Sequence, residues 1–162
     1  MPVPCLGGPR HMIFHPQAPA VYALTELTSQ ICVYDVATSG ALLQRKGATL
    51  ATHEDGKCHT SSDIQVRPDG AFVYAVNRDP SELVQFKVLP DFNLSRVASF
   101  PLRGEVRSFA MDPRGAFLQV GSSAGILQAF SVDELTGCLA LGPSLTELGS
   151  IRHTEIHYLY VS

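Results

Sequence analysis

The sequence predicts an all-β protein, a partial β-propeller of about three four-stranded antiparallel blades with a C-terminal closing strand. Two observations carry this prediction. Three similar segments recur along the chain, and their shared prolines, Pro16, Pro68 and Pro113, lie 52 and 45 residues apart, close to the roughly 40–50 residues of a propeller repeat. Short stretches of alternating apolar and polar residues, separated by turn residues, fill each repeat and are typical of β-strands.

The first two strands of each blade follow from these segments. The segments begin at His11, Asp63 and Ser108 and read HMIFHPQAPAVYALTE, DIQVRPDGAFVYAVNR and SFAMDPRGAFLQVGSS. In each one, an apolar stretch precedes the proline and a second follows it, which predicts an antiparallel hairpin. An ordinary β-sandwich could carry turns at similar spacing, but the segments match in residue type as well as in spacing, which favours repeated blades.

The third strand of each blade contains an aromatic residue 17–18 positions after the proline, namely Tyr34, Phe86 or Phe130. These residues lie in the stretches ICVYDV, LVQFKV and LQAFSV, and a polar turn and a fourth apolar stretch follow each one. Four short strands per repeat make one propeller blade. The expected blades of this single partial propeller domain span residues 7–52, 58–103 and 104–149.

The last apolar stretch, Ile156–Val161, lies about one repeat after Pro113. We interpret residues 154–162 as a closing strand, the inner strand that one terminus of a propeller supplies to a blade formed by the other. Closed propellers typically need about 4 to 8 blades, so 162 residues correspond to an incomplete ring. We therefore expect a fragment that exposes blade faces and strand edges and self-associates through them.

Composition argues against several classes of function. The chain has 12 Lys and Arg against 15 Asp and Glu, a net charge of −3, which argues against nucleic-acid or membrane-surface partners. No apolar run approaches the roughly 20 residues of a membrane span, and the N-terminal residues lack the apolar core of a secretory signal. Four widely spaced cysteines without a C-x-x-C pair indicate reduced thiols and a cytoplasmic protein.

Two pairs of histidines have the four-residue spacing that can bind zinc on a helix: His11 with His15, and His153 with His157. Both pairs fall in predicted strands, where residues four apart lie roughly 13 Å from each other, so we expect no metal site. The Cys-His pair at residues 58–59 lies in a loop, a poor setting for a nucleophile and its base. The sequence has no G-x-S-x-G, P-loop or dinucleotide fingerprint, and we expect no cofactor.

Counting outward from the turn of each predicted hairpin indicates which residues face each other across it. We place the turn centres at Ala18, Gly70 and Gly115. The facing pairs are then Arg10 with Glu26, Ser62 with Arg78, and Arg107 with Ser123. All six residues belong to one rim of the propeller, where inner strands begin and second strands end. The guanidiniums and the carboxylate there form either an anion-binding cluster or a set of solvated rim charges.

The motifs at this rim are similar to those of a known family. GPRH at residues 8–11 leads into FHP at 14–16 and is followed by Glu26-Leu27, while PDG at 68–70 is followed by NR at 77–78. In this order and spacing the chain resembles the lactonase family of seven-bladed β-propellers, of the 6-phosphogluconolactonase and carboxy-muconate cyclase type. The resemblance covers residues 7 to 142 and corresponds to the family's C-terminal three blades.

The resemblance implies a lactone hydrolase in which Arg10, Glu26 and Arg78 are catalytic. Glu26 would act as general base or acid, and the two arginines would hold the oxyanion or an acidic group of the substrate. His11, from the GPRH motif, and Arg107 are the expected substrate-binding residues. The family's own catalytic histidine lies one blade before GPRH, and we expect activity to be impaired because the N-terminal blades are absent. The alternative is a non-catalytic propeller that acts as a binding or interaction module.

The family also suggests the substrate. It implies a small lactone or sugar acid, with 6-phosphogluconolactone of the pentose phosphate pathway as the first choice. The chain departs from the family pattern at Thr25, where an asparagine usually precedes the glutamate, and at residues 17–19, where the family has a glycine-containing turn. These departures concern the surroundings of the expected site rather than its charged residues.

Overall fold

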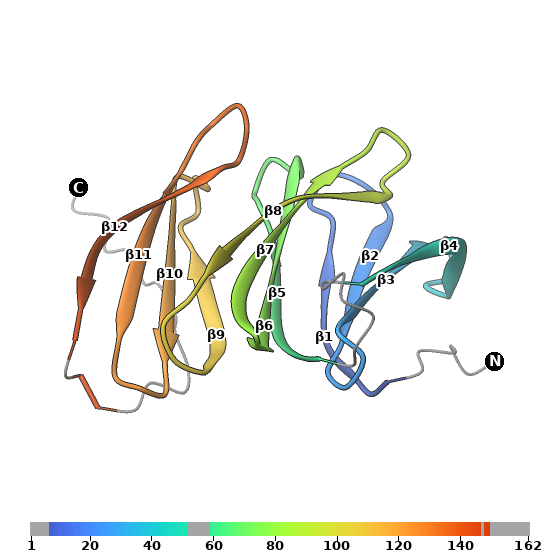
Figure 1. Cartoon of the computed structure of the whole chain (residues 1–162). Helices are drawn as coiled ribbons and strands as arrows, with labels where there is room; N and C mark the ends of the chain where they lie inside the picture. Colours follow the sequence, from blue (N-terminus) through green and yellow to red (C-terminus); the bar gives the residue numbers. More distant parts are fainter. Residues whose placement is uncertain (1–6, 52–58, 147, 150–162) are drawn as a thin grey trace.

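The computed structural model describes residues 7–51, 59–146 and 148–149. The described residues contain twelve β-strands, arranged as three antiparallel four-stranded sheets in which each strand pairs with its neighbours along the chain (Figure 1). The first sheet contains β1 (Pro9–Phe14), β2 (Ala20–Thr25), β3 (Gln30–Val36) and β4 (Leu42–Ala51). The second contains β5 (Thr60–Val66), β6 (Phe72–Asp79), β7 (Ser81–Val88) and β8 (Leu94–Pro101). The third contains β9 (Val106–Met111), β10 (Phe117–Ser122), β11 (Leu127–Val132) and β12 (Leu139–Leu145).

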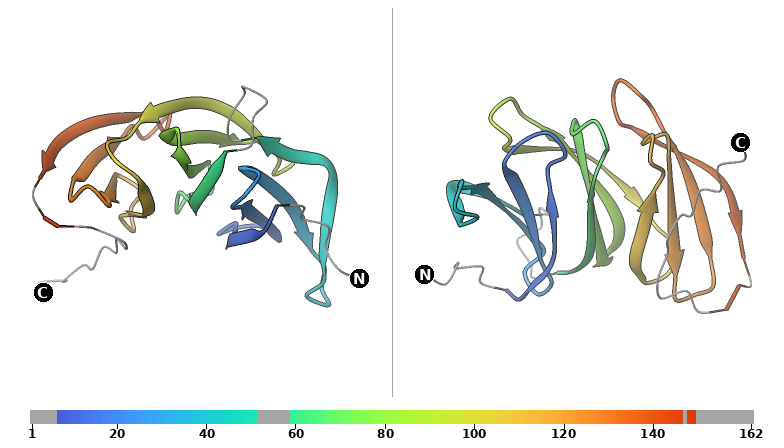
Figure 2. Two further views of the ribbon diagram at one scale, coloured as in Figure 1. Left: turned by 60° about the horizontal axis from the view of Figure 1, so that its bottom comes forward. Right: turned by 180° about the vertical axis from the view of Figure 1, so that it is seen from behind.

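The three sheets fan out around a common side of the molecule. The inner strands β1, β5 and β9 lie along the concave side of the arc, and the outermost strands β4, β8 and β12 lie along its convex side (Figure 2). This arrangement confirms the predicted all-β partial propeller. The expected closing strand, residues 154–162, falls outside the described residues. Within the part of the chain that is described, no helix has the length and apolar character needed to cross a membrane.

Apolar side chains hold neighbouring sheets together. One buried cluster, which includes Tyr22, Leu24 and Phe86, joins the first sheet to the second. Another, which includes Tyr74 and Phe109, joins the second to the third. Alternate residues of a strand point to opposite faces of its sheet, so a strand between two covered faces is apolar at every position. This explains why β2 reads AVYALT and is buried throughout.

The first hairpin of every sheet closes in the same way. The closing backbone hydrogen bonds run from His15 N to Ala20 O at 2.9 Å, from Arg67 N to Phe72 O at 2.8 Å, and from Asp112 N to Phe117 O at 2.9 Å. Each bond encloses four turn residues, so the centre of the turn falls between two residues. The sequence count, which placed the centre on a single residue, was therefore wrong by one position in each hairpin.

A β-bulge near the start of each inner strand changes the register further. Pairing passes from Pro9↔Thr25 to His11↔Leu24, which leaves Arg10 as an extra residue. The other two inner strands repeat the pattern, and their extra residues are Ser62 and Arg107. The predicted face-to-face pairs are thus wrong in detail, although their members do share one rim. A bulge bends the strand and redirects its side chains, so the same irregularity recurs where the candidate site lies.

Candidate functional site

The backbone around Glu26 joins the first two sheets. Glu26 N donates to Gly8 O at 2.8 Å, and Glu26 O accepts from Ser61 N of the second sheet at 3.0 Å. The preceding residue, Thr25, is buried and its Oγ1 accepts a 2.9 Å hydrogen bond from Gln30 N. The threonine that departs from the family pattern thus stabilises the turn after β2 and fixes the place at which Glu26 leaves the strand.

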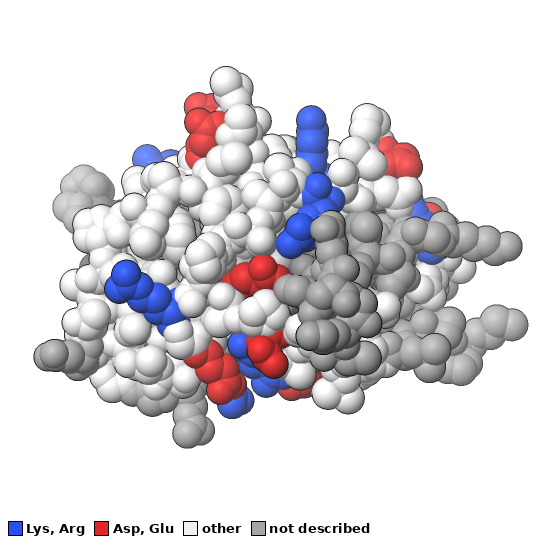
Figure 3. All heavy atoms as spheres, viewed as in Figure 1, with Lys and Arg blue, Asp and Glu red and all other residues white. Residues whose placement is uncertain are grey.

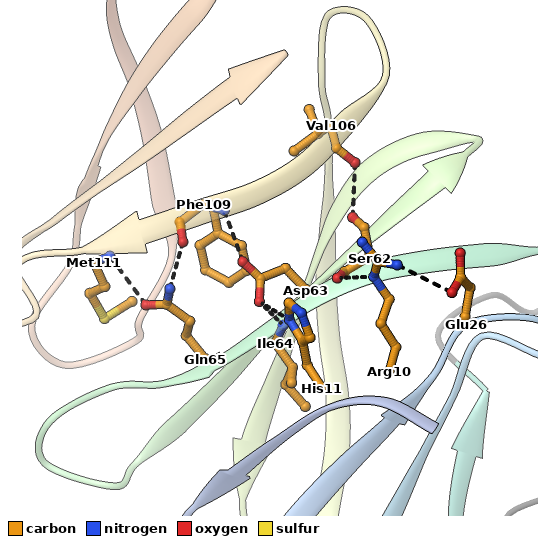
Figure 4. A network of polar contacts seen from close by, with 10 residues as sticks. All are labelled: Arg10, His11, Glu26, Ser62, Asp63, Ile64, Gln65, Val106, Phe109 and Met111. Atoms are coloured by element: carbon orange, nitrogen blue, oxygen red, sulfur yellow. Dashed lines mark hydrogen bonds and ion pairs between the residues drawn. The ribbon is translucent and has the colours of Figure 1, made fainter. Parts of the chain in front are cut away.

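Three of the predicted site residues meet at this place. Glu26 Oε2 lies 3.2 Å from Arg10 Nη1, and its other oxygen, Oε1, pairs with Arg78 Nη2. Arg10 is held in turn by a 2.7 Å hydrogen bond from its Nε to Ser62 O, and Figure 4 shows Arg10 between Glu26 and the second sheet. Glu26 therefore forms one charged cluster with Arg10, which lies 16 positions before it, and Arg78, which lies 52 positions after it.

The cluster has an excess of positive charge. The hydrogen bond from Arg78, aided by the charge of Arg10, holds the pKa of Glu26 below its usual range against a smaller opposing effect of burial. Glu26 is therefore ionised at neutral pH, and two guanidiniums face one carboxylate. Arg78 Nε is buried and has no hydrogen-bond acceptor among the described residues. Guanidinium groups in such a setting favour an anionic ligand.

A cavity of about 530 Å³ opens beside the cluster, within the size range of small-molecule sites. Its lining contains Glu26 and Arg78 together with Leu27, Thr60, Asp79 and Glu105. In Figure 3, blue and red side chains are interspersed along the lower edge of the described surface. The cavity lining itself carries three carboxylates and one guanidinium, a mixture expected for a site that recognises a small molecule rather than a polyanion.

The two predicted substrate-binding residues differ in their settings. His11, next to Arg10 on β1, has its Nδ1 atom 2.7 Å from Asp63 Oδ1 of the second sheet. Arg107 pairs with Glu105 at 2.9 Å, and both side chains are nearly half exposed. His11 is thus held close to the cluster through a buried partner, whereas Arg107 is a solvated residue whose partner lines the cavity.

Sequence reasoning missed Asp63 and the cavity residues Asp79 and Glu105. Asp63 had a usable signal, because it occupies in the second repeat the position that His11 occupies in the first, and equivalent positions of neighbouring inner strands lie close together. Asp79 and Glu105 lie at the end of β6 and just before β9, where no pattern in the sequence marks them. Among the described residues, no group of three or more His, Cys, Asp or Glu is arranged to hold a metal ion.

Comparison with known proteins places this geometry in a family. The family model described as "Lactonase, 7-bladed beta-propeller" matches residues 2–151. The chain belongs to this lactonase family. A relative of the family from Pectobacterium carotovorum, named 6-phosphogluconolactonase, is 34% identical over 138 residues, which cover 82% of this chain and 41% of the relative. Another with the same name, from Formosa agariphila, is 33% identical over 120 residues, 72% of this chain and 33% of the relative.

Solved structures of similar proteins have the same architecture. The periplasmic gluconolactonase of Pseudomonas aeruginosa matches with a TM-score of 0.83 and 30% identity, covering 93% of this chain and 42% of that one. A protein from Lactobacillus plantarum matches with a TM-score of 0.81 and 26% identity, covering 88% and 42%. The lactonase resemblance predicted from the rim motifs is thereby confirmed. The chain spans about two fifths of the length of the relatives it matches.

Proposed function

We propose that this chain takes part in the hydrolysis of a sugar lactone to the free acid, with 6-phosphogluconolactone as the substrate. The observation that carries the proposal is the cluster in which Arg10 and Arg78 share the Glu26 carboxylate at the edge of a cavity. Relatives at 30% identity or above are named 6-phosphogluconolactonase or gluconolactonase, which supports the same reaction.

The arginines suit the charges of this reaction. Attack of water on the lactone carbonyl places negative charge on the carbonyl oxygen, and preorganised donors there lower the barrier. Arg78 lines the cavity while its Nη2 pairs with Glu26, so its guanidinium can bind the oxyanion without leaving Glu26. Arg10 can then bind the phosphate or carboxylate of the substrate, and Arg107 can turn from its solvated pair with Glu105 toward the same group.

Glu26 acts in this proposal mainly as an ionised acceptor. Because its pKa is held below the usual range, it does not carry the proton that a general acid must give at neutral pH. It orients the two guanidiniums and accepts hydrogen bonds from the hydroxyl groups of the sugar. We place the activity in the pentose phosphate pathway, as the name of the relatives suggests, and in the cytoplasm, on the basis of the widely spaced cysteines of the sequence.

The test is a lactonase assay on purified protein. Hydrolysis of 6-phosphogluconolactone and of gluconolactone is followed by proton release and corrected for the spontaneous reaction. We expect the phosphorylated lactone to be preferred and Glu26→Ala to reduce kcat/KM. Arg114→Ala is the matched control, since this arginine is 78% exposed in the turn before β10. Hydrolysis at the spontaneous rate would overturn the proposal, and binding of 6-phosphogluconate without turnover would indicate a binding module instead.

A further inference from the structure

Because of the bulge in β1, the side chains of two consecutive residues, Arg10 and His11, point in the same direction. In a regular strand, neighbouring side chains point to opposite faces, but Arg10 is the extra residue of a bulge. Arg10 Nε reaches Ser62 O at 2.7 Å, and His11 Nδ1 reaches Asp63 Oδ1 at 2.7 Å. Both side chains therefore extend from β1 to β5 (Figure 4), and His11 lies directly beside an arginine of the proposed site.

Asp63 holds His11 with a rigid carboxylate. Its side chain is 10% exposed, its Oδ1 accepts a hydrogen bond from Ile64 N at 2.8 Å, and its Oδ2 accepts one from Phe109 N at 3.0 Å. Both oxygens are thus oriented by the backbones of β5 and β9. Since this carboxylate acts as an acceptor toward the backbone, His11 Nδ1 is the donor in the contact between them.

This contact determines which ring nitrogen of His11 is free. With the proton on Nδ1, the neutral ring has its lone pair on Nε2. No described residue forms a hydrogen bond with Nε2, and the His11 side chain is 44% exposed. The ring therefore presents a proton acceptor to solvent one residue along β1 from Arg10 of the cluster, with its orientation fixed by Asp63.

We propose that His11 Nε2 is the proton acceptor that activates the attacking water, and that Asp63 is its positioning residue. This inference rests on the proposed lactone hydrolysis. One water proton passes to Nε2 while the water oxygen bonds to the carbonyl carbon, which gives a tetrahedral oxyanion. The bond to the ring oxygen then breaks, and the imidazolium returns the proton to that oxygen, which gives the hydroxy acid.

The alternative base, Glu26, is less suited to this step. Both of its oxygens are engaged by guanidiniums, and this pairing holds its pKa below the usual range, which makes it a weak proton acceptor. An imidazole oriented by a carboxylate is a recurrent general base. The division of roles is therefore that the arginine cluster binds negative charge and the His11–Asp63 pair moves the proton.

The first experiment measures the tautomer of His11 by ¹⁵N NMR, at a pH where the ring is neutral. We expect the Nδ1–H form in the wild-type protein. In Asp63→Ala, the Nδ1–H group loses the acceptor that holds it, so we expect the Nε2–H form, which neutral histidine favours in water, to become the major one. An Nε2–H ring in the wild type, or the same tautomer in both proteins, would overturn the role of Asp63 whether or not the chain turns over lactone.

The second experiment separates positioning from structural support. Gln65 also joins β5 to β9, through hydrogen bonds of 2.5 Å to Phe109 O and 3.2 Å from Met111 N, but it does not touch His11. Gln65→Ala should therefore lower thermal stability without changing the His11 tautomer or kcat. Asp63→Ala should lower kcat by about 10²–10⁴-fold with little change in KM, as expected when a general base loses the carboxylate that orients it.

The third experiment tests His11 itself. His11→Ala should lose kcat by a similar factor and regain part of it when imidazole is added, because free imidazole can occupy the space and accept the proton. Full kcat in His11→Ala would overturn the base assignment. If the wild-type chain hydrolyses lactone only at the spontaneous rate, the proposed function fails, and with it the base assignment, while the tautomer result still decides whether Asp63 positions His11.

Discussion

The two rims of the molecule use the same kinds of residues in opposite ways. At the rim of the hairpin turns, Arg67 pairs with Asp69 only two residues away and lies 4.7 Å from the centre of the Phe72 ring. At the site rim, Arg10 and Arg78 pair with Glu26 over 16 and 52 residues. Arg67 also donates to Asp133 O at 3.3 Å, so all three of its nitrogens are engaged, whereas Arg78 Nε has no acceptor among the described residues.

Two histidines show the same difference. His15, at the turn rim, donates from Nε2 to Gly70 O at 3.2 Å and accepts at Nδ1 from Gln17 N at 3.2 Å. Both nitrogens are committed to the backbone, so this ring is structural. Among the described residues, His11 at the site rim has a hydrogen-bond partner at Nδ1 alone. The two rims therefore differ in whether the polar atoms of their side chains already have hydrogen-bond partners, and not in the types of residue they contain.

The largest expected effect is the loss of an arginine from the site rim. Arg78→Ala should lower kcat/KM for 6-phosphogluconolactone by about 10²–10³-fold, because donors to a developing oxyanion are typically worth that much. Its counterpart at the other rim, Arg67→Ala, should retain kcat/KM and lose about 1.5–3 kcal/mol of stability, the usual value of hydrogen bonds to charged groups. Steady-state kinetics and urea denaturation of both variants would contradict the comparison if the two effects were exchanged.

The next largest effect is expected on the stability of the protein, from a substitution at the rim of the hairpin turns. Gly70 has a φ of +77°, and a Cβ there would lie 2.5 Å from Cε1 of the buried His15. Gly70→Ala should therefore destabilise the protein by about 2–3 kcal/mol, of which about 1 kcal/mol is backbone strain. Gly40→Ala is the control, because Gly40 has a φ of +82° but nothing within 4 Å of the added carbon. Equal melting temperatures for the two variants would show that the contact with His15 is unimportant.

A smaller effect is expected on self-association, which we propose for the chain on the basis of β1. Met12 and Phe14 on this strand are 56% and 60% exposed, which is unusual for such large apolar side chains near one another. Phe14→Lys should raise the dissociation constant of self-association by about tenfold, equivalent to roughly 1.4 kcal/mol. Light scattering after size exclusion measures this. A wild-type chain that stays monomeric at all concentrations would contradict it.

The smallest effect is on the pH dependence of stability. The pKa of Glu26 is lowered in the folded state, so its ion pairs contribute stability that is fully present above the ordinary glutamate pKa and is lost as the pH falls through the folded-state value. Glu26→Gln should remove this contribution. The free energy of unfolding of the variant, measured from about pH 6 down to pH 3, should therefore fall less steeply than that of the wild type. Parallel curves would contradict the pairing.

The periodic features of the fold could be predicted because they are local. Alternation of apolar residues, a proline-led turn and an aromatic third strand recur within each repeat, and each depends on neighbouring residues alone. The register could not be predicted to the residue, because the turns contain four residues and a bulge adds one more at Arg10. A bulge depends on how the strand packs against the next sheet rather than on a sequence signal.

For the site, the motifs around Arg10, Glu26 and Arg78 were sufficient to bring these residues to one rim, since strands of repeated blades begin and end together. The partner of His11, in contrast, was not predicted from the sequence. The sequence by itself determined the blade repeat, the family and the charged residues of the rim, because each of these depends on short motifs of neighbouring residues. Only the tertiary structure decided that Asp63 holds His11 and that Arg78 shares Glu26 with Arg10. The contacts of Asp63 and Arg78 run between the first two sheets, and their geometry depends on packing that no single repeat contains.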